Sequence, residues 1–419
     1  MNRRILFCLL LVFLTGCNLP FLQENGQDEL IGKIVIEDIS SEHVEEFVEI
    51  QQPINTQGGG DGTVVEKTEE TQDEVEKIVV TNDEETTGYA YSVLGEEDQV
   101  LYLEILEILI TLGEDIEVSA MDTDKIDKVF QCVMLDHPEI FYVDGYTYTQ
   151  HTLADVLQKI TFTGIYLYDA EEIFRRNELL LASANDFLSG ITMDATEYEK
   201  VKYVYEEIIN RCQYNLEASD SQNICSVLLN NESVCQGYAK TMQYLLQKLD
   251  VTVALVAGGV SSGEGHVWNL VQIDGAYYYV DSTWGDASYT IASETQIETI
   301  TTPSINYDYL CITTEQLLET HTIDDIVPMP YCSATVANYY VMENLYFTYV
   351  DKDMLTQLFE EAYHSDAETV TIKCQSKEVY QEMITYLIEE QGIFSYLQNQ
   401  NASIAYSYME EQYSVSFWL

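Results

Sequence analysis

Three short stretches of the sequence carry the side-chain types of a cysteine-based catalyst. Cys235 lies in SVCQGYA, His266 in GHVWN and Asp281 in YVDSTWGD, in that order along the chain. A cysteine attacks as its thiolate, an imidazole takes up and returns a proton, and a carboxylate orients the imidazole. Together the three residues predict nucleophilic attack on a carbonyl carbon, with Cys235 as nucleophile, His266 as base and acid, and Asp281 as orienter.

The sequence around Cys235 predicts a helix that begins close to the cysteine. The residues before it are loop and cap types (Asn230, Asn231 and Ser233), and the apolar residues after it recur at helical spacing (Ala239, Met242, Leu245, Leu246 and Leu249). A thiol at a helix N-terminus meets the positive end of the helix dipole, which favours the thiolate, and the backbone amide of the same residue can face an oxyanion. Taken alone, such a cysteine is more often part of an inert core.

A predicted hairpin carries the other two residues. The apolar strand 267–273 follows His266, Asp274-Gly275 is a strong signal for a two-residue turn, and 276–281 is the return strand. The turn fixes which residues of the two strands face each other.

With this register, Asp281 faces Trp268 and His266 faces Thr283. His266 and Asp281 are then diagonal neighbours on the same face of the sheet, about 7–8 Å apart at the backbone, which is within reach of a side-chain hydrogen bond. A three-residue loop would reverse the faces. Taken separately, His266 has an ordinary interpretation as a strand-edge histidine and Asp281 as a turn residue.

The three stretches resemble the signature stretches of the transglutaminase-like superfamily, in the same order and with compatible spacing. DHPEIFYV (136–143) resembles a segment found before this domain in exported bacterial members, and the helix ending in RCQY (211–214) resembles the family's lead-in to the core. The strong resemblance covers roughly 195–290 and weakens back to about 95. It implies an α+β, papain-like fold in which a helix bearing Cys235 packs on an antiparallel sheet bearing His266 and Asp281, and it implies the same three catalytic roles.

Other positions that match the family, or lie near its motifs, receive structural interpretations. Trp268, Trp284 and Asp286 are expected to serve packing and turn formation, and His137 is expected to be a loop or cap residue. Gln236 would point along the helix, so the second oxyanion donor is unassigned. The sequence contains no EF-hand-like loop, so no cofactor is predicted.

The charge balance limits the partners. The 419 residues include 18 basic and 72 acidic ones, for a net charge of -54. Phosphate binding requires clustered Lys and Arg, so a nucleic-acid partner is excluded. Charge of this size keeps a surface protein soluble. The expected partner is a peptide or protein substrate, including cell-envelope material.

The N-terminus predicts export and a lipid anchor. Arg3 and Arg4 precede the apolar run Ile5–Leu14, which is too short to span a bilayer, and the sequence LTGC that follows resembles a bacterial lipobox. We expect cleavage of a signal peptide, 1–16, and lipidation of Cys17, so that the protein is held at the cell membrane, facing outside the cytoplasm, through the anchor alone. An ordinary signal peptide with a chance cysteine is the alternative.

The rest of the chain is divided by composition. We expect an acidic disordered stalk over 17–88, in which the apolar patches 30–36 and 44–50 could form transient helix or strand. The other expected regions are an N-terminal α+β extension (89–194), the transglutaminase-like core (195–300), a connector (301–338) and a small α+β domain (339–419). Expected helices lie near 101–109, 126–133, 170–188, 196–212, 354–363 and 378–390. Expected strands lie at 140–143, 160–168, 345–350, 370–374, 402–407 and 413–418.

The nine cysteines leave their pairing open. Apart from Cys8, Cys17 and Cys235, six remain, which are either disulfides or buried thiols, and Cys212 with Cys225 is a plausible pair. The sequence contains no C-x-x-C spacing, so a structural zinc site is weakly supported.

The sequence favours an acyl-transfer enzyme, either a peptidase or amidase or a protein cross-linker. Nothing in the sequence decides between water and an amine as acceptor. Two alternatives remain: a non-catalytic surface module that keeps the fold, and a zinc site formed by Cys235, His266 and Asp281.

Overall fold

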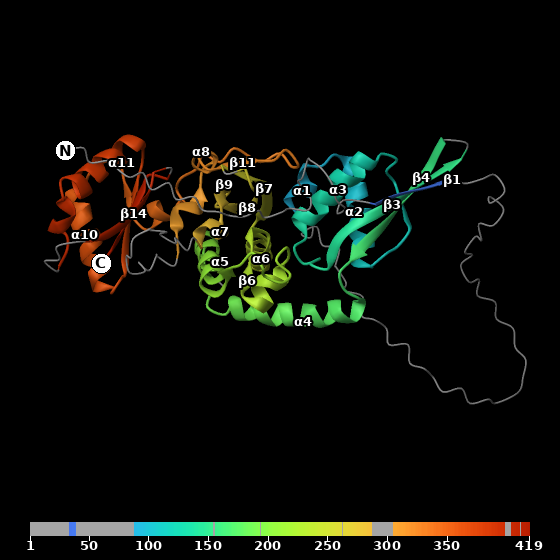
Figure 1. Ribbon diagram of the computed structural model, residues 1–419, viewed down its shortest axis with the longest axis horizontal. Coiled ribbons are helices and arrows are strands. Elements are labelled where there is room, and N and C mark those ends of the chain that lie inside the picture. The colour runs from blue at the N-terminus through green and yellow to red at the C-terminus, as the bar shows by residue number, and fades with distance from the viewer. Residues whose placement is uncertain are drawn as a thin grey trace, which may run out of the picture.

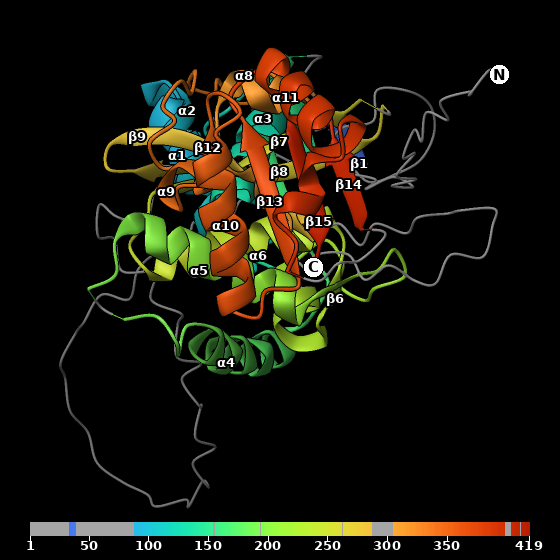
Figure 2. The same ribbon diagram turned by 90° about the vertical axis from the view of Figure 1, so that its left-hand side faces the viewer.

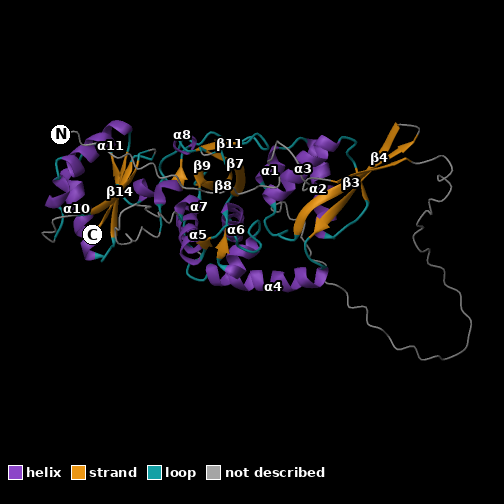
Figure 3. Cartoon of the chain, viewed as in Figure 1, coloured by secondary structure: helices purple, strands orange, loops and turns teal. Residues whose placement is uncertain are grey.

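The computed structural model describes residues 33–38, 88–153, 156–192, 194–261, 263–286, 305–398, 404–410 and 412–419. The described chain forms three units in a row along the longest axis, with the N-terminal and C-terminal units on opposite sides of a central unit (Figure 1). Helices and strands are mixed within every unit, as Figure 3 shows, so the fold is α+β as expected. The predicted signal peptide and Cys17 lie outside the described residues. No helix of the described chain is long and apolar enough to cross a membrane.

The N-terminal unit packs helices on a four-stranded sheet of order β1-β3-β4-β2. The helices are α1 (Tyr89–Val93), α2 (Glu96–Ile110) and α3 (Thr123–Asp136). The strands are β1 (Lys33–Asp38), β2 (Ile116–Val118), β3 (Val143–Leu153) and β4 (Val156–Tyr166). β1 pairs in parallel with β3, so a strand occupies part of the acidic segment, at one of its two apolar patches.

Local signals explain where these elements begin and end. The Asp122 side chain accepts a hydrogen bond from the Asp124 amide and so caps α3. The strand expected at 140–143 is wrong for its first three residues, because the chain turns after Pro138 and β3 begins only at Val143. His137 is the C-cap residue of α3, as its loop or cap interpretation predicted.

The central unit contains the five-stranded sheet β10-β9-β8-β7-β11 and the helices around it. The helices are α4 (Ala170–Phe187), α5 (Glu197–Arg211), α6 (Cys235–Lys248), α7 (Ser282–Gly285) and α8 (Thr314–Leu318). The strands are β7 (Val253–Val260), β8 (Gly265–Ile273), β9 (Ala276–Val280), β10 (Leu310–Ile312) and β11 (His321–Ile323). Both edge strands, β10 and β11, come from the segment that we expected to be a connector.

Different groups pack on the two faces of this sheet. Val267 and Asn269 belong to the face on which α6 packs: Val267 clusters with Ala239, and the Asn269 side-chain amide donates to the Ala239 carbonyl at 3.0 Å. Trp268 and Leu270 alternate with them and therefore face the opposite side. There they are buried in a separate cluster with Tyr279 and other apolar residues.

The C-terminal unit has its own sheet and its own core. The sheet has the order β12-β13-β15-β14, with β12 (Tyr346–Phe347), β13 (Thr369–Cys374), β14 (Ala405–Met409) and β15 (Ser414–Trp418). Figure 2 looks onto this unit, in which α10 (Lys352–His364) and α11 (Lys377–Ile384) pack against β13. The expected helices and strands of this region are present, with shifted ends.

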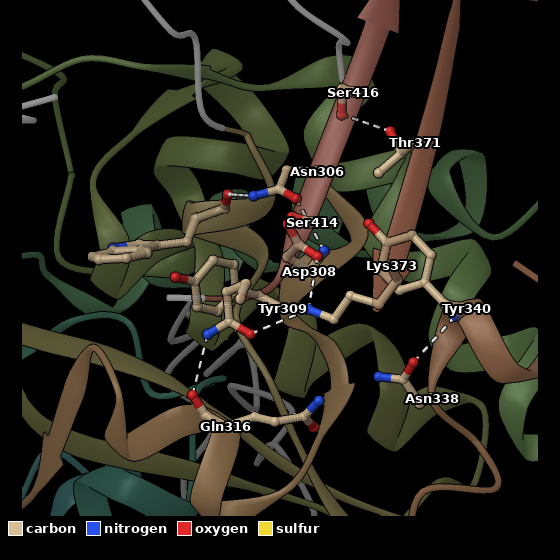
Figure 4. Close-up of polar contacts among 12 residues, drawn as sticks. Asn306, Asp308, Tyr309, Gln316, Asn338, Tyr340, Thr371, Lys373, Ser414 and Ser416 are labelled. Atoms are coloured by element: carbon tan, nitrogen blue, oxygen red, sulfur yellow. Dashed lines mark hydrogen bonds and ion pairs between the residues drawn. The ribbon is translucent and has the colours of Figure 1, made fainter. Parts of the chain in front are cut away.

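A buried polar cluster joins the C-terminal unit to the central unit (Figure 4). The Lys373 ammonium on β13 donates to Asp308 Oδ1 at 2.9 Å, and both side chains are buried. The Ser414 hydroxyl donates to Asp308 Oδ2, and the Gln412 amide donates to the carbonyl of Gln316 in α8 at 3.1 Å. Asp308 lies in the short 3₁₀ helix Tyr307–Tyr309, so side chains of the C-terminal unit contact two segments of the central one.

The cysteines other than Cys235 in the described chain are buried free thiols, so the suggested pairing of Cys212 with Cys225 is wrong. They are Cys132, Cys212, Cys225, Cys311, Cys332 and Cys374.

Candidate active site

Cys235 is the first residue of α6, as the sequence predicted. The preceding Val234 is extended, and the cysteine side chain is buried beside Val234 and Tyr214. A helix N-terminus presents amides that lie outside the helix's own hydrogen-bond ladder, and the helix dipole is positive there. The position therefore favours a thiolate.

The glycine of CQGYA lets the chain fold tightly under this helix turn. The hydroxyls of Ser226 and Ser233 lie 2.6 Å apart directly below Gly237. A Cβ at Gly237 would collide with both hydroxyl oxygens. Glycine at this position thus permits the close packing that holds the start of α6 in place.

The hairpin has the predicted register. β8 pairs antiparallel with β9, with Ile273 opposite Ala276 and Asn269 opposite Val280. One residue beyond β9, Asp281 reaches back to His266, and its Oδ2 lies 2.7 Å from His266 Nε2. Both side chains are almost completely buried. The structure therefore brings together two of the three predicted site residues in direct contact.

Asp281 is held at both carboxylate oxygens. Its Oδ1 accepts hydrogen bonds from the amides of Thr283 and Trp284 and so caps α7, and its own amide donates to the Tyr309 carbonyl at 3.0 Å. Burial alone would raise the pKa of this carboxyl. The charge of His266 and the hydrogen bonds from His266 and His321 outweigh the burial and hold the pKa well below its usual range. Asp281 is therefore ionised and can only accept.

Because the Asp281 carboxylate only accepts, the proton between it and His266 belongs to Nε2. The Nδ1 atom of a neutral His266 is then the position that can accept a proton. Tyr214, which packs on Cys235, has its pKa raised to about 12, first by burial and then by Glu264 and Asp281. Tyr214 therefore lies within electrostatic range of both Asp281 and the start of β8, which links the surroundings of Cys235 to those of the His266–Asp281 pair.

A second histidine, His321, contacts the same carboxylate and is not among the site residues predicted from the sequence. His321 Nε2 lies 3.2 Å from Asp281 Oδ2, and its Nδ1 lies 2.7 Å from the Thr320 hydroxyl. Burial lowers the pKa of His321, with partial opposition from Asp281. No motif marks this residue, and its strand is only three residues long, so the sequence carries no periodic signal for it.

Aromatic rings enclose the two histidines. Trp268 stacks near the His266 ring at a centroid distance of 5.8 Å, and Trp284 lies 4.8 Å from His321. Tyr309 packs edge-on against Trp284 at 5.0 Å. These rings exclude water from the carboxylate and its histidines, which agrees with the packing roles expected for both tryptophans and strengthens the hydrogen bonds inside.

Asp286 also has a packing partner. The Tyr238 hydroxyl of α6 donates to Asp286 Oδ2 at 2.5 Å, and burial raises the pKa of Asp286 to about 6. This contact ties the turn after Asp281 to the first turn of α6, so the predicted turn interpretation of Asp286 agrees with its position.

His266, Asp281 and His321 are the group in the described chain whose ligand atoms lie close enough together to hold a metal ion, all within 4.8 Å. Cys235 is not in this group, so the zinc site that we considered for Cys235, His266 and Asp281 does not match it. Each proton among the three side chains already has an acceptor, so hydrogen bonding accounts for their arrangement.

Part of the chain is similar to known proteins. A sequence model of the Transglutaminase-like superfamily matches residues 185–282. Kyphoscoliosis peptidase of Mus musculus is 25% identical over 118 residues, which cover 24% of this chain and 18% of that protein. The matched region thus spans about a fifth of the length of this relative.

Two solved structures are similar over part of the chain. A TGase has a TM-score of 0.25 at 12% identity and covers 37% of this chain and 53% of its own. A putative cysteine protease from Cytophaga hutchinsonii has a TM-score of 0.22 at 15% identity and covers 30% and 51%. Residues 185–282 thus match a transglutaminase-like domain, and they contain a helix that packs on an antiparallel sheet.

Proposed function

We propose that this domain is a cysteine acyl-transfer enzyme that attacks amide bonds of peptides or proteins. The observation that carries the proposal is the buried contact between His266 Nε2 and Asp281 Oδ2 at 2.7 Å, which leaves His266 Nδ1 to serve the thiol of Cys235. The position of Cys235 at the start of α6 supports the same roles.

In the proposed reaction, His266 Nδ1 takes the thiol proton and the Cys235 sulfur bonds to the carbonyl carbon of the amide. The carbonyl oxygen becomes an oxyanion, which backbone amides near the start of α6 stabilise. His266 then returns the proton to the departing nitrogen, the C–N bond breaks and a thioester remains. Water or a primary amine releases the acyl group from Cys235. Asp281 keeps the imidazole oriented and stabilises its cationic form throughout.

The burial of Cys235 favours a second candidate function, a surface module that keeps the fold without turnover. A nucleophile must be reached by its substrate, and the Cys235 side chain is enclosed in the described structure. The same chemical experiment decides between the two functions, because alkylation requires both access and a thiolate.

The test is the pH dependence of iodoacetamide labelling at Cys235 in the full chain, after reduction with a thiol-free reductant and with peptide mapping. Labelling that persists well below pH 8 and is lost in His266→Ala supports the enzyme. Labelling that follows an ordinary thiol value of about 8.5 and ignores His266 supports the surface module.

The chain supplies its own controls for this experiment. Burial raises the pKa of the Cys132 thiol and of the Cys225 thiol to about 11, so neither should label at pH 6. The exposed His364 of α10 provides a matched substitution, His364→Ala, which should leave labelling of Cys235 unchanged. The acceptor is then identified by mass: an amide-bearing peptide is incubated with and without a primary amine, and the product is either the acid or the new amide.

We also propose that a lipid attached to Cys17 holds the protein at the membrane, where the enzyme acts outside the cytoplasm. This proposal rests on the N-terminal sequence. Cells that express the full chain and are fed an alkyne-labelled fatty acid should label the protein. Cys17→Ser should abolish the label, whereas Cys8→Ser should keep it. Label retained in Cys17→Ser would contradict the anchor.

A further inference from the structure

His321 reaches the site from a strand that lies beyond the family match. β11 pairs antiparallel with β7, with His321 opposite Val260 and Ile323 opposite Gly258, and Gly258 in turn lies opposite His266. Residues two apart on a strand share a face, so His321, Val260, Gly258 and His266 all lie on one face of the sheet. The order of the strands therefore brings this histidine to the same carboxylate as His266, from the opposite side of β7.

We propose that His321 is a positioning residue, which holds the Asp281 carboxylate in the orientation in which that carboxylate fixes the His266 ring. The proposal rests on the catalytic roles proposed for Cys235 and His266. His321 itself does not touch the thiol in this scheme.

The hydrogen bonds around His321 define its tautomer. The Asp281 carboxylate can only accept, so His321 Nε2 carries the proton that it shares with Oδ2. The Thr320 hydroxyl lies 2.7 Å from Nδ1 and 3.4 Å from the Leu317 carbonyl, and the shorter contact assigns its proton to the unprotonated nitrogen. His321 is thus a neutral ring with both nitrogens engaged, and Thr320, which directly precedes β11, holds the ring in this orientation.

Asp281 is thereby held at four points. Two backbone amides bind Oδ1, and the two imidazoles bind Oδ2 at 2.7 Å and 3.2 Å. Without His321, Oδ2 would keep His266 as its one hydrogen-bond donor among these side chains. The carboxylate could then pivot about Oδ1, because His266 alone among these side chains would restrain Oδ2. A rotation of this kind swings the His266 ring and moves Nδ1 relative to the thiol.

The titratable groups that face His321 come from three elements. Asp281 follows β9, His266 lies on β8 and Tyr309 lies in the 3₁₀ helix 307–309, with its ring centroid 5.8 Å from that of His321. A charged His321 would place a second cation beside His266. The neutral ring avoids this repulsion, so it positions the carboxylate without opposing the cation that His266 becomes during catalysis.

The test compares two amides of different reach in the full chain. In His321→Gln, the side-chain NH₂ can extend to the place of Nε2 and keep the bond to Asp281. In His321→Asn, the shorter amide reaches only the place of Nδ1, so Thr320 keeps a partner and Asp281 loses one. Both variants introduce the same polar group, so a general cost of altering the site is similar in the two.

Two readouts are expected to separate the variants. The alkylation rate of Cys235 at pH 6 should fall in His321→Asn, up to about 100-fold, towards that of His266→Ala, and should be largely restored in His321→Gln. In ¹H–¹⁵N spectra of histidine-labelled protein, the low-field Nε2–H signal of His266 should persist in His321→Gln and move or broaden in His321→Asn. Thermal unfolding confirms that each variant is folded.

The outcomes distinguish the two proposals. If wild-type Cys235 labels as an ordinary thiol that is indifferent to His266, the proposed function fails. If wild-type labelling depends on His266 but His321→Asn matches the wild type in rate and in the His266 signal, the positioning role alone is overturned. An equal loss of the alkylation rate in His321→Gln and His321→Asn would also overturn the positioning role, because the hydrogen bond to Asp281 would then not be the cause.

Discussion

Two buried aspartates of the central unit, Asp281 and Asp308, have different kinds of partner. Asp281 is bound by two imidazoles and two backbone amides. Asp308 is bound by the ammonium of Lys373 and the hydroxyl of Ser414, both from the C-terminal unit (Figure 4). Both carboxylates are almost completely buried, so neither could remain charged without these partners.

The partners determine what each carboxylate can do. An imidazole can gain and lose a proton near neutral pH, so a proton can move through the Asp281 network. A lysine ammonium offers three donors and no acceptor, so Lys373 can neutralise and tether Asp308 but cannot relay a proton from it. The first arrangement suits chemistry, and the second fixes one unit of the protein on another.

The two clusters are nonetheless connected through the backbone. Tyr309, which follows Asp308, accepts a hydrogen bond from the Asp281 amide at 3.0 Å. Asn306 begins the same 3₁₀ helix, and its amide donates to the Gly285 carbonyl at the end of α7 at 2.8 Å. A change at Asp308 can therefore reach Asp281, and the following substitutions test how far the roles of the two are separate.

The largest expected effect is on chemistry at Asp281. Asp281→Asn keeps an oxygen for the α7 cap but presents an amide NH₂ where two imidazole N–H groups donate. One ring must then change tautomer. The acyl-transfer rate should fall about 10⁴-fold, the loss seen when a triad carboxylate becomes an amide. Asp250→Asn, the same change at an exposed turn residue, should leave the rate unchanged, and a comparable loss there would remove the significance of the first result.

The next effect is on stability at Lys373. Lys373→Met leaves Asp308 as a buried charge without its cation, which should cost about 3–5 kcal/mol in the free energy of unfolding, as measured by urea denaturation. The double variant Lys373→Met with Asp308→Leu should be more stable than Lys373→Met alone. If the two substitutions were instead additive, the buried pair would not be the unit that holds the two domains together.

A smaller effect on the free energy of unfolding is expected from substitutions at two serines of β15. Ser414→Ala removes a donor from the buried Asp308 carboxylate and should cost about 1–3 kcal/mol. Ser416→Ala, two residues along the same strand, loses a partly buried contact with Thr371 Oγ1 and should cost less. Equal losses in urea denaturation would indicate that Asp308 does not depend on the hydroxyl. Neither substitution should alter the pH dependence of Cys235 labelling.

The smallest effect is the pH dependence of stability that His321 confers. Because burial lowers the pKa of His321, the folded state prefers the neutral ring, and the full contribution is present above the ordinary histidine value of about 6.5. Below that pH the unfolded chain binds a proton that the folded chain resists, so stability falls by at most about 1.4 kcal/mol per pH unit.

The measurement for this effect is the free energy of unfolding of wild type and His321→Gln from pH 8 to pH 5. The wild-type curve should fall more steeply below pH 6.5. Asp286, whose pKa is raised to about 6, contributes with the opposite sign, but equally in both proteins. Parallel curves would show that His321 is not the buried neutral base described above.

The sequence predicted the parts of the site that depend on local spacing. The two-residue turn at Asp274-Gly275 determined the register of the hairpin, and the apolar spacing after Cys235 determined the start of α6. Both inferences use periodicities of a few residues, which do not depend on the rest of the fold. The catalytic roles of Cys235, His266 and Asp281 remain predictions.

The parts that the sequence could not predict depend on contacts between distant segments. His321 reaches Asp281 only because β11 adds to the outer edge of β7, and a three-residue strand carries no pattern that would indicate its neighbour. For Lys373 the sequence indicates that a partner exists, because a lysine in the apolar strand VTIKC requires a buried partner. The identity of that partner, Asp308, follows only from how the two units pack.

The outer strands of the central sheet also bear on the solubility of shortened chains. The family match ends at residue 282, but β10 and β11, which cover the outer edges of β9 and β7, lie between Leu310 and Ile323. A chain cut soon after the match would expose a row of unpaired backbone amides and carbonyls on each side of the sheet, and such edges recruit strands from other copies. Such a fragment should aggregate, whereas a chain continued through β11 should not aggregate by this route.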